Sequence, residues 1–180
     1  MDKLTPKARV YQWLQEAVVG LNLCPFAKPY TQNDSIKVFE SSKLKLEDAL
    51  AELMDYLEKM DSSSVKEISN LLVVYSDGFC NFNDFLDLID TALELLESSH
   101  FNKDFQFAYF HPDFQFEDSS KDSKANYTAR SPYPVMHILR SDLVESARET
   151  NSDINQIPEI NVKRVSSLDE KTLKKLFLDK

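Results

Sequence analysis

The chain has 180 residues, of which 42% are hydrophobic and 28% charged, a balance typical of a globular protein rather than of a disordered chain. Its formal net charge of −9 repels nucleic-acid backbones, so we expect no general nucleic-acid binding. No stretch approaches the ~18 apolar residues of a membrane-spanning helix, and residues 1–14 lack the apolar region of a secretory signal. We therefore expect one cytoplasmic domain over residues 1–180, without membrane association.

The glycines and cysteines exclude several kinds of site. Gly20 and Gly78 are the only glycines in the sequence, and neither GxxxxGK[ST] nor GxGxxG can be written with them. Nucleotide sites built on glycine-rich loops are therefore excluded. Cys24 and Cys80 are too few for a disulfide framework, and we expect both as reduced thiols. The sequence indicates no particular cofactor and leaves the oligomeric state open.

The chain begins with an amphipathic helix. Thr5 is its expected N-cap, Pro6 occupies the first helical position, and apolar residues then recur with the helical period as far as Leu21. Residues 22–35 contain Pro25 and Pro29 among polar residues, which predicts an irregular connection.

Three strands and two helices alternate over the middle of the chain. Residues 36–40 alternate between apolar and polar, residues 71–75 are continuously apolar, and residues 105–110 are aromatic-rich, so each predicts a strand. Apolar stripes at helical spacing lie between them, over residues 46–60 and 85–96. This order predicts a βαβαβ unit with right-handed crossovers and parallel strands.

A long loop separates this unit from the rest of the chain. Residues 112–133 far exceed the usual ~4–6 residues between elements, and such loops are commonly functional or disordered. Residues 134–140 fit a strand and the start of a helix about equally, and we predict a strand antiparallel to the third. A helical extension is expected over about residues 158–180, with a capping box that begins at Ser167. The predicted fold class is an α/β sandwich with a three- to four-stranded mixed sheet flanked by helices.

A ligand site is expected beyond the carboxyl ends of the parallel strands, where open sheets usually bind their ligands. The third strand delivers His111-Pro112-Asp113 to that edge. Histidine titrates near neutrality, so His111 is a candidate acid or base. It is equally well interpreted as a residue that ends the strand and bonds a backbone carbonyl. Asp113 is a candidate ligand-binding residue.

The end of the long loop supplies candidate anion-binding residues. The planar guanidinium of arginine suits a carboxylate or phosphate, so Arg130 and Arg140 are candidate clamps, with Asn126 as a further ligand-binding candidate. The alternative is that Arg130 pairs with an acidic neighbour and fastens the loop. Because residues 134–140 should return beside the third strand, we expect His111, Arg130 and His137 to line one cleft.

Cys24 and His137 complete the catalytic candidates. Cys24 follows the first helix and would be a nucleophile if His111 or His137 lay over it, while a small buried residue is the better-supported interpretation. Cys24, His111, Asp113 and His137 have no local metal-ligand spacing, and we predict no metal site.

Several sequence blocks resemble a known family. The blocks are Gly20 to Ala27, Phe82 to Asp87, Phe110 to Phe116 and Asn126 to Arg140. Together they are similar to the bacterial family catalogued as domain of unknown function 1415, over about residues 5–165. The resemblance implies no particular activity, substrate or cofactor.

Two functions remain as hypotheses. The first is an enzyme or binding protein for a small anionic ligand, a carboxylate or a phosphate, which requires a pocket lined by His111 and Arg130. The second is an interaction or regulatory domain, which requires an exposed apolar patch on residues 112–133. We favour the first, because small ligands usually bind at the carboxyl edge of such a sheet.

Overall fold

The computed structural model describes residues 4–24, 27–150 and 154–179. Its four strands form one open sheet in the order β1 (Ile36–Ser41), β2 (Asn70–Tyr75), β4 (Val135–Arg140) and β3 (Phe105–Phe110). β1 and β2 are parallel, and β4 is antiparallel to both of its neighbours. The predicted α/β class with a mixed, helix-flanked sheet is confirmed, and every strand lies within one residue of its predicted bounds.

The fourth strand has the predicted direction but an unexpected place. It was expected to extend the set of three parallel strands, whereas β4 lies between β2 and β3. Burial explains this order: Val135, Met136 and Ile138 in β4 are buried, while Phe105 is the buried residue of β3. The more apolar strand therefore takes the interior position, and β3 becomes an edge strand.

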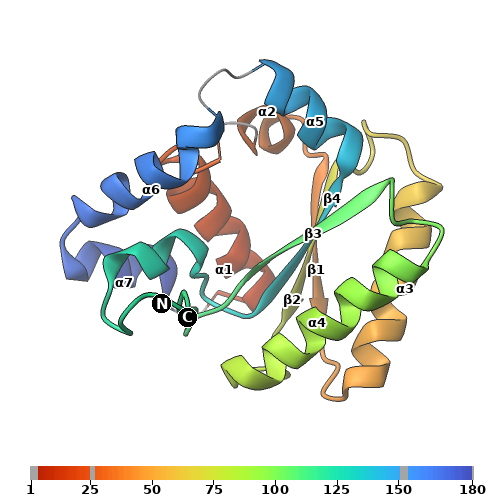
Figure 1. Ribbon diagram of the computed structural model, residues 1–180, viewed down its shortest axis with the longest axis horizontal. Helices are drawn as coiled ribbons and strands as arrows, with labels where there is room; N and C mark the ends of the chain where they lie inside the picture. The colour runs from red at the N-terminus through yellow and green to blue at the C-terminus, as the bar shows by residue number, and fades with distance from the viewer. Residues whose placement is uncertain (1–3, 25–26, 151–153, 180) are drawn as a thin grey trace.

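Helices α3 (Leu46–Asp61) and α4 (Phe82–Ser98) cover one face of the sheet (Figure 1). Both connect strands that run in the same direction, as the predicted βαβαβ unit requires. Asn81 caps α4 by accepting hydrogen bonds from the backbone of Asn83 and Asp84. The apolar stripes of the two helices pack on Leu71, Val73 and Tyr75 of β2 and form one of two cores.

The other face is covered by the two ends of the chain (Figure 1). Helix α1 (Pro6–Trp13), capped by Thr5 as predicted, continues into the π-helical segment η1 (Leu14–Val19). Near them lie α6 (Ile157–Ser166) and α7 (Glu170–Phe177). The buried Arg9 joins both ends, because its guanidinium donates to the carbonyl oxygens of Lys175 and Asp179 at 2.6 and 2.5 Å.

Two local predictions were wrong. The N-cap of α7 is Asp169, whose carboxylate accepts from the backbone of Thr172 at 2.9 Å, while Ser167 is the C-cap of α6. The predicted irregular segment 22–35 contains helix α2 (Ala27–Gln32). The remaining elements are α5 (Ser141–Thr150), η2 (Lys124–Ala129) and η3 (Ile154–Gln156). None of the helices in the described ranges is long and apolar enough to cross a membrane.

Candidate functional site

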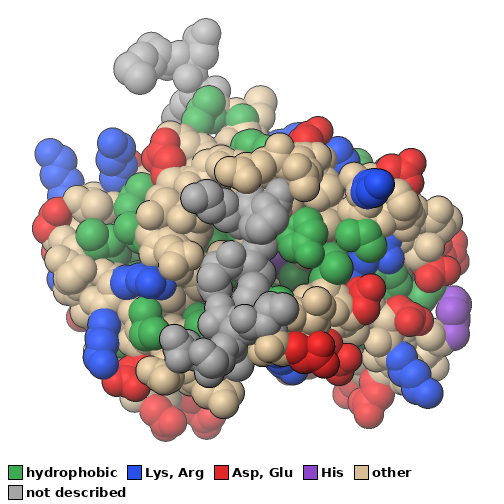
Figure 2. All heavy atoms as spheres, turned by 90° about the horizontal axis from the view of Figure 1, so that it is seen from above, with side chains coloured by type: hydrophobic (Ala, Val, Ile, Leu, Met, Phe, Trp, Pro, Cys, Tyr) green, Lys and Arg blue, Asp and Glu red, His purple; other side chains and the backbone are tan. Residues whose placement is uncertain are grey.

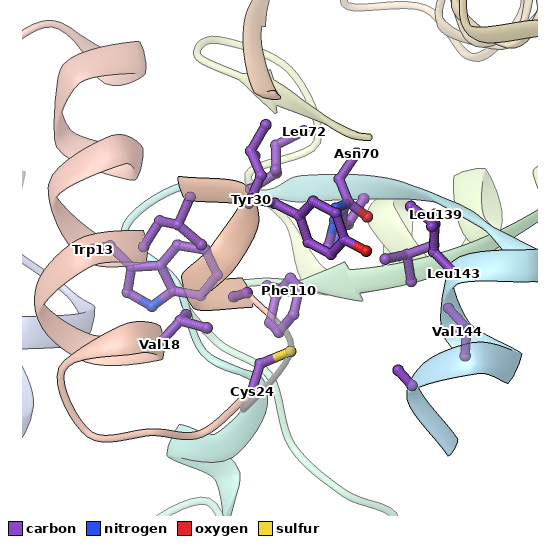
Figure 3. A pocket seen from close by; sticks show the side chains of 15 residues that line it. Trp13, Val18, Cys24, Tyr30, Asn70, Leu72, Phe110, Leu139, Leu143 and Val144 are labelled. Atoms are coloured by element: carbon purple, nitrogen blue, oxygen red, sulfur yellow. The ribbon is translucent and has the colours of Figure 1, made fainter. Parts of the chain in front are cut away.

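A cavity of about 220 Å³ lies on the face of the sheet that α1 covers, between α2 and α5. Figure 2 looks onto this end of the molecule, where hydrophobic side chains gather around a hollow. The wall is largely apolar and comes from all four strands and the surrounding helices (Figure 3). The lining residues are Trp13, Leu14, Val18, Cys24, Ala27, Tyr30, Ile36, Asn70, Leu72, Phe110, His137, Leu139, Leu143, Val144 and Ala147.

His137 is the titratable imidazole of this wall. It lies in β4 directly opposite Leu72 of β2, on the face of the sheet turned toward Trp13. Its Nε2 atom is buried and has no hydrogen-bond partner among the described residues. Burial lowers the pKa of His137 from 6.5 to about 4, so the imidazole is neutral at pH 7.

Trp13 closes the opposite end of the cavity. Its indole ring meets Phe110 edge-on, with ring centroids 5.1 Å apart. The indole Nε1 is also buried without a partner among the described residues, but in Figure 3 it lies on the edge turned away from Tyr30 and Leu139. The part of Trp13 nearest the other lining residues is therefore its apolar six-membered ring.

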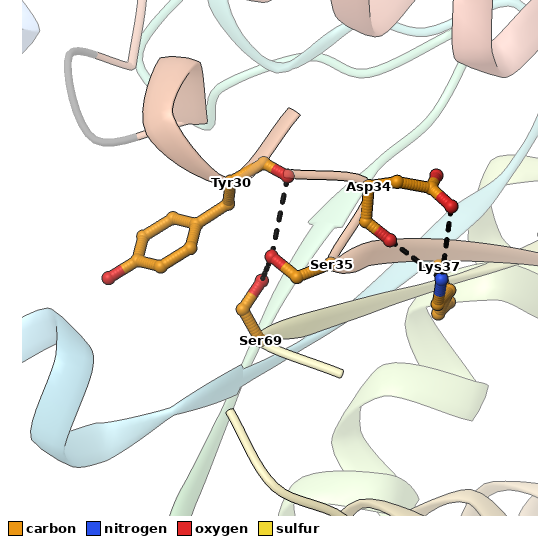
Figure 4. A network of polar contacts seen from close by, with 5 residues as sticks. All are labelled: Tyr30, Asp34, Ser35, Lys37 and Ser69. Atoms are coloured by element: carbon orange, nitrogen blue, oxygen red, sulfur yellow. Dashed lines mark hydrogen bonds and ion pairs between the residues drawn. The ribbon is translucent and has the colours of Figure 1, made fainter. Parts of the chain in front are cut away.

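A polar network at the start of β1 and β2 holds two further wall residues (Figure 4). Ser35 Oγ lies 3.3 Å from the carbonyl oxygen of Tyr30 and 2.9 Å from Ser69 Oγ. The side-chain amide of Asn70 donates to the same Ser69 oxygen at 3.2 Å. The network therefore joins the backbone of α2 at Tyr30 to the sheet and holds the side-chain amide of Asn70.

Cys24 forms the cavity wall between η1 and α2. Its side chain is half-buried and carries a thiol, and in Figure 3 the sulfur is turned toward Phe110. The second thiol, Cys80, is exposed and lies near the carbonyl oxygens of Asp77 and Gly78. Of the two cysteines, Cys24 is the one at the cavity.

His111 lies away from the cavity and is completely buried. Its Nδ1 accepts from the backbone N–H of Asp113 at 3.0 Å, so its Nε2–H donates to the carbonyl oxygen of Phe79 at 3.1 Å. The ring packs against Phe82 and Phe85 of α4, with centroids 5.1 and 5.2 Å away. These contacts match the expectation that His111 ends the strand and bonds a carbonyl; Asp113 itself is exposed.

Arg130 fastens the long loop, but through different partners from those expected. It is only 7% exposed, and its guanidinium donates to the carbonyl oxygens of Phe114 at 3.2 Å and Lys121 at 3.0 Å. It also lies 4.6 Å from the ring centroid of Tyr127. Backbone carbonyl oxygens take the place of the expected acidic side chain as the partners of Arg130.

Asn126 holds the same loop from inside. It is fully buried, accepts from the backbone N–H of Phe116 at 3.1 Å and from Ser119 Oγ at 2.6 Å, and donates to the carbonyl oxygen of Ser120 at 2.9 Å. Residues 112–123 form no helix or strand, so the Asn126 side chain supplies hydrogen bonds that regular secondary structure would otherwise provide.

Arg140 binds the end of α3 rather than the cavity. Its guanidinium donates to the carbonyl oxygens of Met60, Ser63 at 2.8 Å and Ile68 at 3.1 Å. A cation at this place also interacts favourably with the negative end of the helix dipole. Arg140 therefore joins β4 to the connection between α3 and β2.

The expected common cleft of His111, Arg130 and His137 is not formed. The cavity includes His137 but neither of the others, because side chains alternate between the faces of a sheet. The cavity also lies over a face of the sheet instead of beyond its carboxyl edge. The backbone is closely packed at that edge, because a Cβ on Gly78 would come within 2.1 Å of the Lys43 carbonyl oxygen.

Two other expectations concern the loop and a metal. The interaction hypothesis requires an exposed apolar patch on residues 112–133. Among the described residues of that loop, Phe116 is the large hydrophobic residue that is exposed, with 41% of its surface accessible.

Among the described residues, no group of three or more His, Cys, Asp or Glu side chains is arranged to hold a metal ion.

Sequence reasoning missed Tyr30, Asn70 and Trp13 as wall residues. Tyr30 lies in the segment predicted to be irregular, and Trp13 has the spacing of an ordinary core residue. Asn70 could have been found, because it precedes the apolar run 71–75 and shares a face with Leu72 by alternation.

No curated protein and no solved structure matches the chain in the comparisons with known proteins. A family model with the description "Protein of unknown function (DUF1415)" matches residues 5–175. That match includes the cavity and the long loop, and it agrees with the resemblance carried by the sequence blocks around Cys24 and His111. The chain belongs to the DUF1415 family.

Proposed function

We propose that this protein binds a small, largely apolar molecule in the cavity between α2 and α5. The observation that carries the proposal is an apolar cavity of about 220 Å³ whose wall contains a histidine without a hydrogen-bond partner among the described residues. An apolar cavity of about 150 Å³ is known to bind benzene, so this one has room for a ligand of about ten non-hydrogen atoms.

The proposal keeps the small-molecule hypothesis and changes the ligand's chemistry. An anionic ligand would need a cationic partner once it left water. The described wall contains neither lysine nor arginine, and Arg130 and Arg140 donate to backbone carbonyls elsewhere. His137 and Cys24 are the reactive side chains of the wall, whereas His111, Arg130, Arg140 and Asn126 support the fold.

A thermal-unfolding experiment tests this function. Toluene and p-xylene should raise the unfolding midpoint in a concentration-dependent way, because a ligand that binds only the folded state stabilises it. Val144→Trp, which places an indole in the cavity, should abolish the increase. Glu145→Trp is the matched control: it adds the same side chain at the next, exposed position of α5 and should retain the response.

The proposal fails if the wild-type protein shows no response to either compound. It also fails if the two tryptophan variants respond alike, because the compounds would then bind outside the cavity.

A further inference from the structure

We infer that the ligand is an uncharged molecule with an apolar body and one hydrogen-bonding head group, which lies between His137, Asn70 and Tyr30. The inference rests on the proposed function and deepens it, since it assigns the class of ligand and its orientation in the cavity.

Three elements bring these polar side chains to one end of the cavity. Asn70 of β2 pairs with Leu139, and Leu72 pairs with His137, so Asn70 and His137 are diagonal neighbours on one face of the sheet. Such neighbours lie about 7–8 Å apart, a distance that a small head group can bridge. In Figure 3 the Tyr30 hydroxyl and the Asn70 amide point to the same side, close to Leu139.

Each of the three side chains has unused hydrogen-bonding capacity among the described residues. Asn70 uses its Nδ2 on Ser69, which leaves Oδ1 as an acceptor. The Nε2 of His137 has no partner among the described residues, and the bond that Tyr30 makes in the network uses its carbonyl oxygen and not its hydroxyl. Buried polar groups in native proteins are normally paired, so the buried Nε2 of His137 points to a partner other than the described residues.

The chemistry of the wall determines the ligand's charge. None of the described lining residues is Lys, Arg, Asp or Glu, so a charged ligand would lose its hydration without gaining a counter-ion. Burial also keeps the imidazole neutral, with one donor and one acceptor nitrogen. A hydroxyl or a carboxamide, which can both donate and accept, matches such a set of partners.

The other end of the cavity determines the orientation. Trp13, Leu14, Val18 and Phe110 form its wall there, and Figure 3 shows Trp13 and Val18 on the opposite side from Leu139 and Asn70. The apolar body therefore lies against α1 and η1, with the head group toward β4 and α2.

The test compares p-cresol with p-xylene, which have similar shapes and differ by a hydroxyl in place of a methyl group. The wild-type protein should bind p-cresol at least as tightly as p-xylene. His137→Leu should weaken the binding of p-cresol about tenfold, because its hydroxyl loses a hydrogen-bond partner. The affinity for p-xylene should change by less than about twofold. His100→Leu, the same substitution at an exposed histidine outside the cavity, is the matched control and should leave the affinity for both compounds unchanged.

Tyr30→Phe is a second variant that keeps the ring and removes the hydroxyl alone; it should weaken p-cresol about threefold and leave p-xylene unchanged. The inference is overturned if wild-type protein binds p-xylene tightly and p-cresol about tenfold more weakly, or if neither substitution affects p-cresol selectively. In both cases the cavity still binds apolar molecules, so the proposed function stands. If neither compound binds, the proposed function itself is overturned.

Discussion

His111 and His137 lie on opposite faces of the same sheet, although they belong to adjacent antiparallel segments. His111 packs on Phe82 and Phe85 beneath α4, whereas His137 lines the cavity together with Trp13 beneath α1. His111 has both ring nitrogens bonded to the backbone, whereas the Nε2 of His137 has no partner within the described ranges. The two histidines should therefore respond differently to substitution.

Replacing His111 should destabilise the fold without affecting the cavity. His111→Leu removes the buried imidazole that pairs with the Phe79 carbonyl and the Asp113 N–H, and should lower the free energy of unfolding by about 2 kcal/mol. Urea denaturation measures this loss, with the exposed His100→Leu as a control that should change stability little. Affinity of the folded variant for p-xylene should equal that of the wild type; a selective loss would assign His111 to the binding site.

Replacing His137 should change how stability depends on pH. The unfolded chain titrates this group near pH 6.5 and the folded protein near pH 4, so the folded state binds the proton less tightly. The contribution of the neutral His137 to the stability of the fold is therefore complete above about pH 6.5, and it is lost as the pH falls toward 4. The two pKa values correspond to a loss of roughly 3 kcal/mol.

The measurement is the difference in unfolding free energy between pH 7.5 and pH 4.5, taken for wild type and for His137→Leu. The wild type should lose more stability than the variant, since other titrating groups contribute equally to both. Equal losses would show that His137 is already hydrogen-bonded or hydrated in the folded protein.

The two cysteines should differ in reactivity and in their response to a ligand. Cys80 is exposed and Cys24 is half-buried in the cavity wall, so iodoacetamide should modify Cys80 faster. Saturating p-xylene should slow the modification of Cys24 and leave that of Cys80 unchanged. Mass spectrometry of Cys24→Ser and Cys80→Ser gives the separate rates. Faster modification of Cys24 would instead indicate an activated thiol, as the nucleophile hypothesis requires.

Arg140 should contribute to stability through hydrogen bonds to the backbone. Arg140→Met removes the donors to Met60, Ser63 and Ile68, and should cost about 2 kcal/mol of unfolding free energy. Arg148→Met is the matched control, because Arg148 is exposed on α5. Inorganic phosphate should not stabilise wild type more than Arg140→Met. A phosphate-dependent increase that requires Arg140 would restore the anion-clamp hypothesis.

Local patterns in the sequence predicted the elements of the fold well. Residues 71–75 are apolar and β-branched enough to require burial on both faces, and β2 is buried along its whole length. Thr5 and Pro6 begin a helix because a side-chain oxygen and a missing N–H satisfy its first turn. His111 continues the alternation of Phe105, Phe107 and Tyr109, and in the structure it lies on the face that α4 covers.

The position of β4 and the site itself were decided by tertiary packing. The sequence determined four strands, their alternation and the classes of site that two glycines and a net charge of −9 exclude. It did not determine that β4 lies between β2 and β3, because strand order depends on which strand buries the most apolar surface against both helical layers. That order brings His137 beside Asn70, 67 positions away along the chain, and beneath α2. A cavity is the space that packed helices leave unfilled, so its location follows from the whole arrangement and from no local pattern.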